Sequence, residues 1–137
     1  MTYNVQDHFE SIKPHLMGIK SKVGDMAVYK HDTIVSLAIA LFGEYCDAEV
    51  EIMASHLNED SVYLDIGTNI GYHLLGIYQR VKCKVIGFEP HPNHFAVATY
   101  NSQHIPVTIY NSAVSNKKGK LNLADFDIET PSNYGEV

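Results

Sequence analysis

The sequence predicts an α/β fold with a parallel sheet, because three short apolar segments alternate with segments of helical periodicity. The predicted strands cover residues 62–66, 85–89 and 107–110. Right-handed crossovers through the intervening helices would place these strands in the order 3-2-1. This arrangement is half of a doubly wound sheet, and we expect helices on both of its faces.

The first part of the chain, residues 1–58, is predicted to be a helical segment in front of the sheet. Apolar residues recur at roughly helical spacing over 7–19. Pro14 lies inside this run, where it removes a hydrogen-bond donor and clashes with the preceding turn. We therefore expect a broken or kinked helix there.

Two further helices are expected before the sheet. Residues 34–42 carry one continuous apolar stripe at helical spacing, and Gly43 can end that helix. A helix over 48–57 is expected to bury its larger apolar side chains, namely Ile52, Met53 and Leu57.

The second part, residues 59–137, holds the strands and is predicted to form one compact domain with the first. A helix is expected over 70–81, and Pro92 is well placed in the first turn of another. Residues 120–124 alternate polar and apolar side chains, which is typical of a half-exposed strand.

Composition excludes several classes of protein. Ten Lys and Arg against 16 Asp and Glu leave a net charge of −6, which argues against a nucleic-acid surface. Only Cys46 and Cys83 occur, so no disulfide framework is predicted. The beginning of the sequence does not have the pattern of a signal peptide, and no apolar run approaches the roughly 20 residues that a membrane helix needs. We expect a soluble, cytoplasmic protein.

The most informative segment joins the first strand to its helix. Asp65 ends the strand, Gly67 lets a ligand approach the backbone closely, and Gly71 opens the helix. The free N–H groups at this helix start, from Asn69 onward, would point into the crevice outside the strand ends, where open α/β sheets bind ligands. Glu89 ends the next strand, 22 residues after Gly67, near the spacing at which an acid meets ribose hydroxyls. The pattern predicts a nucleoside pocket.

The charge of this pocket favours one ligand class. A dinucleotide site receives a pyrophosphate, usually at G-x-G-x-x-G, but Asn69 stands where that pattern needs glycine. The carboxylate of Asp65 would repel a pyrophosphate and attract an ammonium group. S-adenosylmethionine carries an amino group and a sulfonium, so we expect that cofactor rather than NAD.

Three motifs that follow one another along the chain together resemble those of a known family. Residues 65–72 (DIGTNIGY), 87–93 (GFEPHPN) and 111–115 (NSAVS), followed by Gly119, resemble the FkbM-type methyltransferases over about residues 33–137. The resemblance implies a Rossmann-like, class I, S-adenosylmethionine-dependent enzyme, with O-methyl transfer to a hydroxyl of a sugar or other small molecule. The family's later strands, which help to shape the acceptor site, have no counterpart before Val137.

The same resemblance implies roles for individual residues. Asp65 and Gly67 would hold the methionine end of the cofactor, Glu89 the ribose diol, and Ala113 would lie beside the adenine. The cofactor-binding residues also include four others within the matched motifs: Thr68, Asn69, Gly71 and Pro90. Alanine is commoner than Thr68 in the family, and its hydroxyl should be tolerated. No catalytic base is assigned.

Several alternatives stay open. His91 and His94 are three residues apart, but no further ligand set is evident, so no metal site is expected. His73 faces either the core or the crevice. The first strand would have an unpaired edge, covered by the tail, by a second copy in a homodimer, or by sequence beyond Val137, which we favour. A nucleoside-binding module without catalysis and an NAD-linked enzyme are the alternative functions.

Overall fold

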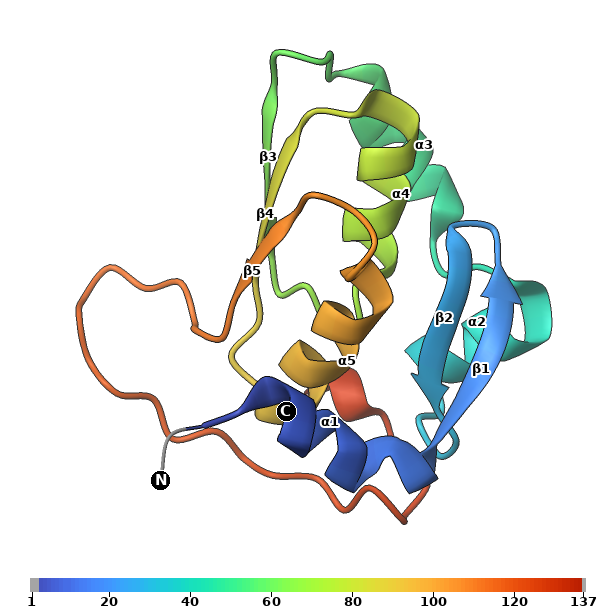
Figure 1. Ribbon diagram of the computed structural model, residues 1–137, viewed down its shortest axis with the longest axis vertical. Helices are drawn as coiled ribbons and strands as arrows, with labels where there is room; N and C mark the ends of the chain where they lie inside the picture. The colour runs from blue at the N-terminus through green and yellow to red at the C-terminus, as the bar shows by residue number, and fades with distance from the viewer. Residues whose placement is uncertain (1–2, 137) are drawn as a thin grey trace.

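The structure is a computed structural model that describes residues 3–136. It confirms a mixed α/β fold with a three-stranded parallel sheet in the order β3-β4-β5 (Figure 1). The elements are α1 (Val5–Ile12), β1 (Leu16–Ser21), β2 (Gly24–Tyr29), α2 (Val35–Phe42), α3 (Asp47–Ser55), β3 (Val62–Ile66), α4 (Tyr72–Val81), β4 (Lys84–Phe88), α5 (Pro92–Ser102) and β5 (Thr108–Tyr110), with short 3-10 turns at Lys13–His15 and Tyr134–Glu136.

The helix expected over 7–19 is broken at Pro14, as predicted, but residues 16–21 form a strand, so the segment before the sheet is not purely helical. Helix α1 ends before Pro14, which lies in a 3-10 turn because it cannot continue the α-helix. The chain then forms an antiparallel hairpin, in which β1 pairs with β2 from Leu16 opposite Tyr29 to Ser21 opposite Gly24. This hairpin was not predicted.

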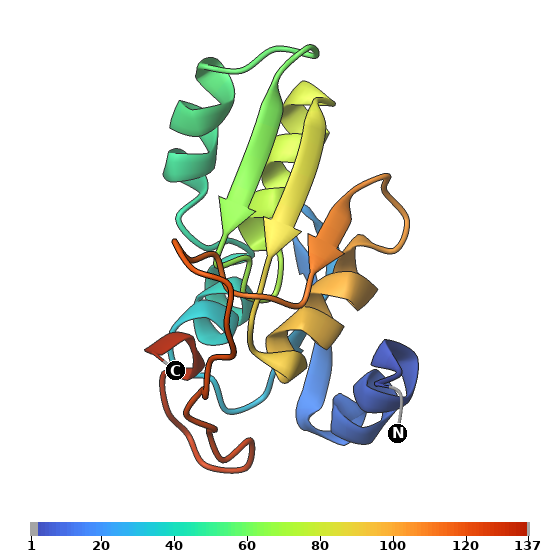
Figure 2. The same cartoon turned by 90° about the vertical axis from the view of Figure 1, so that its left-hand side faces the viewer.

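Helices cover only one face of the parallel sheet. Figure 2 looks onto the other face, where β3, β4 and β5 lie open and the tail crosses below the strand ends. Side chains that alternate outward along the strands make this outer face apolar: Val62, Leu64, Ile66, Phe88 and Tyr110. The expectation of helices on both faces is therefore wrong for residues 3–136.

The unpaired edge of β3 is also uncovered in this part of the chain. Strand β3 pairs with β4 alone, so the tail does not add a strand beside it. Residues 120–124 form no strand and are mostly exposed, in contrast to the prediction for them. No helix among residues 3–136 is long and apolar enough to cross a membrane.

Helices α2 and α3 form as predicted but turn different side chains inward. The apolar stripe of α2 is largely exposed, up to 72% for Phe42. The burial predicted for α3 holds in part: Met53 and Leu57 are half-buried against the core, but Ile52 is exposed, and the buried residues of the helix are Asp47 and Val50. Asp47 is the reason, because its carboxylate pairs with Arg80 of α4 at 2.9 Å and thereby sets the rotation of α3.

Helix α4 packs unusually close to its neighbours on two sides. A Cβ placed on Gly76 would lie 2.7 Å from Val50 of α3. A Cβ placed on Gly87 of β4 would lie 2.6 Å from the Thr68 hydroxyl and 2.9 Å from Leu74 of α4. Glycine at these two positions is therefore a condition of the packing.

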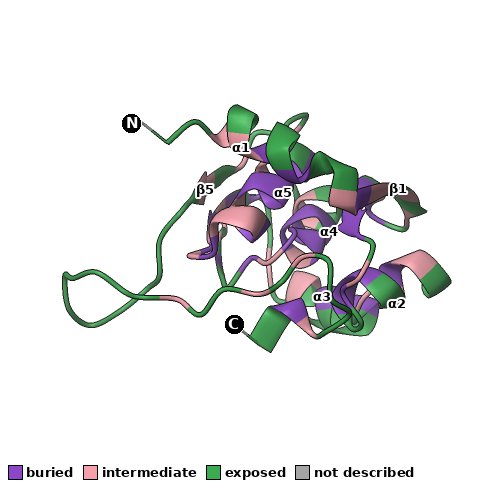
Figure 3. Cartoon of the chain, turned by 90° about the horizontal axis from the view of Figure 1, so that it is seen from below, coloured by how far each residue is buried: buried purple, intermediate pink, exposed green. Residues whose placement is uncertain are grey.

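The tail after β5 is extended and mostly exposed until it returns to the body of the molecule, as Figure 3 shows by burial. It is anchored there by Tyr134, which is fully buried and stacks on Phe126 with ring centroids 4.2 Å apart. A bridge between Ser132 and Asp32 holds the same end. The anchored tail lies beside the carboxyl ends of the strands (Figure 2).

Candidate functional site

The turn from β3 to α4 has the shape that the sequence predicted. Gly67 and Gly71 adopt left-handed φ angles of +85° and +95°, which favour glycine. The backbone N–H groups of Gly67 and Thr68 both donate to the Phe88 carbonyl, at 2.9 and 3.1 Å. These hydrogen bonds fix the turn to the end of β4.

A cavity of about 240 Å³, here called the Asp65 cavity, lies at this turn. Four of the predicted cofactor-binding residues line it together: Asp65, Gly67, Thr68 and Asn69. The tail contributes Asn133 and Gly135 to the lining, and a Cβ placed on Gly135 would lie 3.4 Å from Nδ2 of Asn69. The cavity is therefore built from segments far apart in the chain, and only its turn was visible in the sequence.

Asp65 is the most unusual group in the cavity. It is only 7% exposed, and its Oδ2 atom is buried without a hydrogen-bond partner among residues 3–136. The other oxygen accepts a long hydrogen bond from the Tyr63 hydroxyl at 3.5 Å. Burial raises the pKa of this carboxyl, and the nearby His73 ring opposes that rise only in part. An unpartnered buried carboxylate oxygen is destabilising unless a ligand supplies a donor.

His73 lines the same cavity, which settles the question that the sequence left open. Its Nε2 atom is buried and has no hydrogen-bond partner in the described part of the chain. The ring stacks on Tyr45, with centroids 6.0 Å apart. The only sequence signal was its position, two residues after Gly71 in the first turn of a helix that opens at the site.

Glu89 has a different environment from the one predicted. It is 5% exposed and does not line the Asp65 cavity. Its two oxygens accept from the backbone N–H groups of Asn69, at 2.7 Å, and His91, at 2.8 Å. Burial raises the pKa of Glu89, while these two hydrogen bonds lower it. The carboxylate thus fastens the β3–α4 turn to the start of α5, and its contact with ribose stays a prediction.

The remaining predicted residues also lie outside the cavity wall. A Cβ placed on Gly71 would lie 3.7 Å from the Cβ of Ala98, so Gly71 brings α4 and α5 together. Pro90 is half-buried, and its carbonyl accepts from Asn111 at 3.0 Å. Ala113 is exposed on the segment after β5.

The two histidines of the second motif belong to the tail anchor. His94 donates from Nε2 to the Tyr134 carbonyl at 2.9 Å, and its Nδ1 accepts from the Tyr29 hydroxyl at 3.1 Å. Burial lowers the pKa of His94 to about 4. His91 lies 3.5 Å from the Asp125 carboxylate. Among residues 3–136, no group of three or more His, Cys, Asp or Glu side chains is arranged to hold a metal ion.

Comparisons with known proteins add no further assignment. No family model matches the chain, and no curated protein matches it.

Proposed function

We propose that this protein is an S-adenosylmethionine-dependent methyltransferase that methylates a hydroxyl of a sugar or other small molecule. The observation that supports the proposal most strongly is the buried Oδ2 of Asp65, unpartnered among residues 3–136, in a cavity at the carboxyl end of β3. A nucleoside cofactor with an ammonium group would supply the missing donor. The order β3-β4-β5 is also that of one half of a Rossmann-like sheet.

The cavity's chemistry fits the amino-acid end of this cofactor. The carboxylate of Asp65 would accept a hydrogen bond from the cofactor's ammonium group. Nε2 of His73, when that nitrogen carries a proton, would donate to the cofactor's own carboxylate. Nothing in the described chain lies within 4 Å of a Cβ position on Gly67, so the ligand can approach the backbone there. The unpartnered atoms therefore match both charges of a zwitterion.

The cavity's size indicates how the rest of the cofactor would be accommodated. Its volume of about 240 Å³ lies below the roughly 300–1,000 Å³ of sites that enclose a whole small ligand. Because Asn133 and Gly135 of the tail also line this small cavity, we expect the tail to shift when the nucleoside binds. Glu89 and Ala113 do not line the cavity, so they would contact the nucleoside only after the tail has shifted.

In the reaction the cofactor supplies an electrophilic methyl group on a sulfonium. The protein's part is to bind and orient, with Asp65 fixing the ammonium and the β3–α4 turn presenting its backbone. The close packing of α4 holds these groups in place. A small-molecule acceptor is the proposed partner.

Isothermal titration with S-adenosylhomocysteine tests the proposal. We expect Asp65→Asn to abolish measurable binding, because the substitution removes the charge that recognises the ammonium. Asp60→Asn, in the exposed turn before β3, is the matched control and should bind like the unchanged protein. Equal affinities of the two variants would refute the role of Asp65, and no binding by the unchanged protein would refute the cofactor.

The small cavity also favours a second candidate, a module that binds a nucleoside cofactor without catalysis. The cavity's volume of about 240 Å³ is below that of sites that enclose one small ligand, so the cavity by itself does not hold a cofactor and an acceptor together. Transfer of a labelled methyl group from S-adenosylmethionine to any hydroxyl compound would exclude this candidate. Binding of S-adenosylhomocysteine without transfer would support it.

A further inference from the structure

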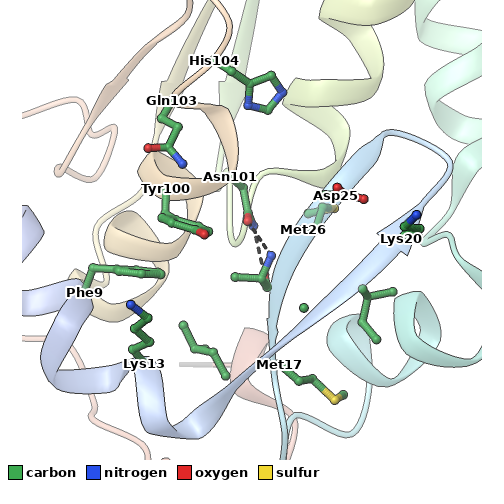
Figure 4. A pocket seen from close by; sticks show the side chains of 14 residues that line it. Phe9, Lys13, Met17, Lys20, Asp25, Met26, Tyr100, Asn101, Gln103 and His104 are labelled. Atoms are coloured by element: carbon green, nitrogen blue, oxygen red, sulfur yellow. Dashed lines mark hydrogen bonds between the residues drawn. The ribbon is translucent and has the colours of Figure 1, made fainter.

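We infer that a second site, separate from the Asp65 cavity, binds a small aromatic anion such as an aryl carboxylate. It is a groove of about 770 Å³ enclosed by α1, the β1–β2 hairpin and the C-terminal half of α5 (Figure 4). This volume lies within the range of small-molecule sites. The groove is thus about three times as large as the Asp65 cavity.

The floor of the groove is open because two small residues face each other in the hairpin. Gly18 pairs with Ala27, between the pair of Leu16 with Tyr29 and the pair of Lys20 with Asp25. Side chains of alternate residues share a face of a strand, so these three pairs lie on one side of the hairpin. Nothing among residues 3–136 lies within 4 Å of a Cβ position on Gly18. A flat ligand can therefore rest on the backbone there.

One wall of the groove is aromatic. Phe9 of α1 and Tyr100 of α5 stack with centroids 4.2 Å apart and planes 11° apart (Figure 4). Phe9 is buried, whereas Tyr100 is 40% exposed. A ring placed in the groove can pack against this wall, which favours an aromatic ligand over an aliphatic one.

The charge of the groove favours an anion. Lys13 and Lys20 line it with one acidic residue, Asp25, although the whole chain has a net charge of −6. Lys13 also contacts Glu10 at 3.2 Å, whereas the structure records no salt bridge for Lys20 among residues 3–136. Lys20 is therefore the cation available to a ligand's carboxylate.

Asn101 joins the structure of the groove to that of the Asp65 cavity. Its side chain accepts from the Ala27 N–H at 2.7 Å and donates to the Ala27 carbonyl at 3.0 Å (Figure 4). It also donates to the Ile70 carbonyl at 2.9 Å. Ala27 lines the groove and Ile70 lines the Asp65 cavity. Among residues 3–136, none lines both the groove and the Asp65 cavity, so the groove is a separate site and its ligand is distinct from the proposed cofactor.

Fluorescence titration with anilinonaphthalene sulfonate tests the inference, with the uncharged N-phenylnaphthylamine as the comparison probe. We expect saturable binding at one site per chain and weaker binding of the uncharged probe. Gly18→Leu should weaken sulfonate binding by about tenfold or more, because the new side chain fills the floor. Gly119→Leu, where a Cβ also meets nothing of the described chain within 4 Å but on the exposed tail, is the matched control and should leave binding unchanged.

Lys20→Gln tests the charge without touching the floor. It should weaken sulfonate binding by about threefold and leave the uncharged probe unaffected. Circular dichroism shows whether each variant is folded, and should Gly18→Leu unfold, Lys20→Gln decides alone. Equal binding of both probes, or unchanged sulfonate binding in either variant, would overturn the inference. Excess S-adenosylhomocysteine should not displace the probe, and displacement would place the probe in the Asp65 cavity instead.

Discussion

Asp65 is a residue at which stability and binding oppose each other. Its buried Oδ2 lacks a partner among residues 3–136, so the folded protein bears the cost of an uncompensated charge. We expect Asp65→Asn to raise the free energy of unfolding by about 1 kcal/mol near neutral pH, measured by urea denaturation. A loss of stability instead would mean that the carboxylate serves the fold.

The pH dependence of this effect follows from the raised pKa of Asp65. The folded protein holds the proton to higher pH than the unfolded chain does, so ionisation destabilises the fold as pH rises through the folded pKa. The advantage of Asp65→Asn should therefore be present above that pKa and disappear as pH falls to 3.8, the ordinary pKa of an aspartate. Urea midpoints of both proteins across this range provide the measurement.

His94 makes stability depend on pH in the opposite direction to Asp65. Its folded pKa is lowered to about 4 from 6.5, so the unfolded chain binds a proton that the folded protein excludes. Stability should fall as pH drops from 6.5 toward 4, by up to about 1.4 kcal/mol per pH unit. In His94→Gln the part of the slope due to His94 should be lost. The parts due to His91, whose pKa burial lowers, and to Asp65 and Glu89, whose pKa values burial raises, should remain. His56→Gln, at an exposed position, should keep the full slope.

At the scale of elements, Tyr134 acts twice on the tail: its ring is buried against the body of the molecule, and its hydroxyl bonds within the tail. The Tyr134 hydroxyl donates among the carbonyls of Asp127, Ile128 and Thr130, 3.0 to 3.3 Å away. Tyr134→Phe should lower stability by about 1 kcal/mol. Tyr134→Ala should release the tail, seen as rapid amide exchange over residues 125–136, whereas Tyr110→Phe on the exposed outer face should change neither.

The same release tests how the cofactor would enter. If the tail must shift before a nucleoside fits, Tyr134→Ala should bind S-adenosylhomocysteine at least as tightly as the unchanged protein. Weaker binding would show that Asn133 and Gly135 hold the ligand rather than exclude it.

The elements were predictable where a single periodicity dominates. The parallel strands and helices α4 and α5 follow from apolar spacing and from glycine and proline at their ends. The hairpin was missed because its two-residue turn, Lys22-Val23, lacks the usual Asn-Gly type of signal. Residues 120–124 alternate like a strand but have no neighbouring strand to pair with in the described part of the chain.

The site was predictable only in its local part. The β3–α4 turn is specified by its own residues, so Asp65 to Asn69 meet at one cavity as expected. His73, Asn133 and Gly135 join it through tertiary contacts that no local pattern reports. The hydrogen bonds of Glu89 to two backbone N–H groups likewise depend on how the turn and α5 approach each other.

At the scale of the whole molecule, the open outer face of the sheet should promote self-association. Leu64 is 53% exposed beside Ile66, and strand β3 has an edge that is unpaired within residues 3–136. We expect the mass from light scattering to rise with protein concentration, and Leu64→Lys to suppress the rise. Ser11→Lys, at an exposed position of α1 away from this face, is the control and should leave the rise unchanged. A constant monomer mass in the unchanged protein would contradict this expectation.

The tight seating of α4 has a consequence for recognition. Gly76 on one side of this helix and Gly87 on the other allow close packing against both neighbours, so we expect its first turn, with His73, to move little when a ligand binds. The first turn of α4 then loses little conformational entropy when a ligand binds. Replacing either glycine with alanine would displace the first turn of α4, which lies at the Asp65 cavity. Affinity for the cavity's ligand would then decline although no residue that touches the ligand has changed.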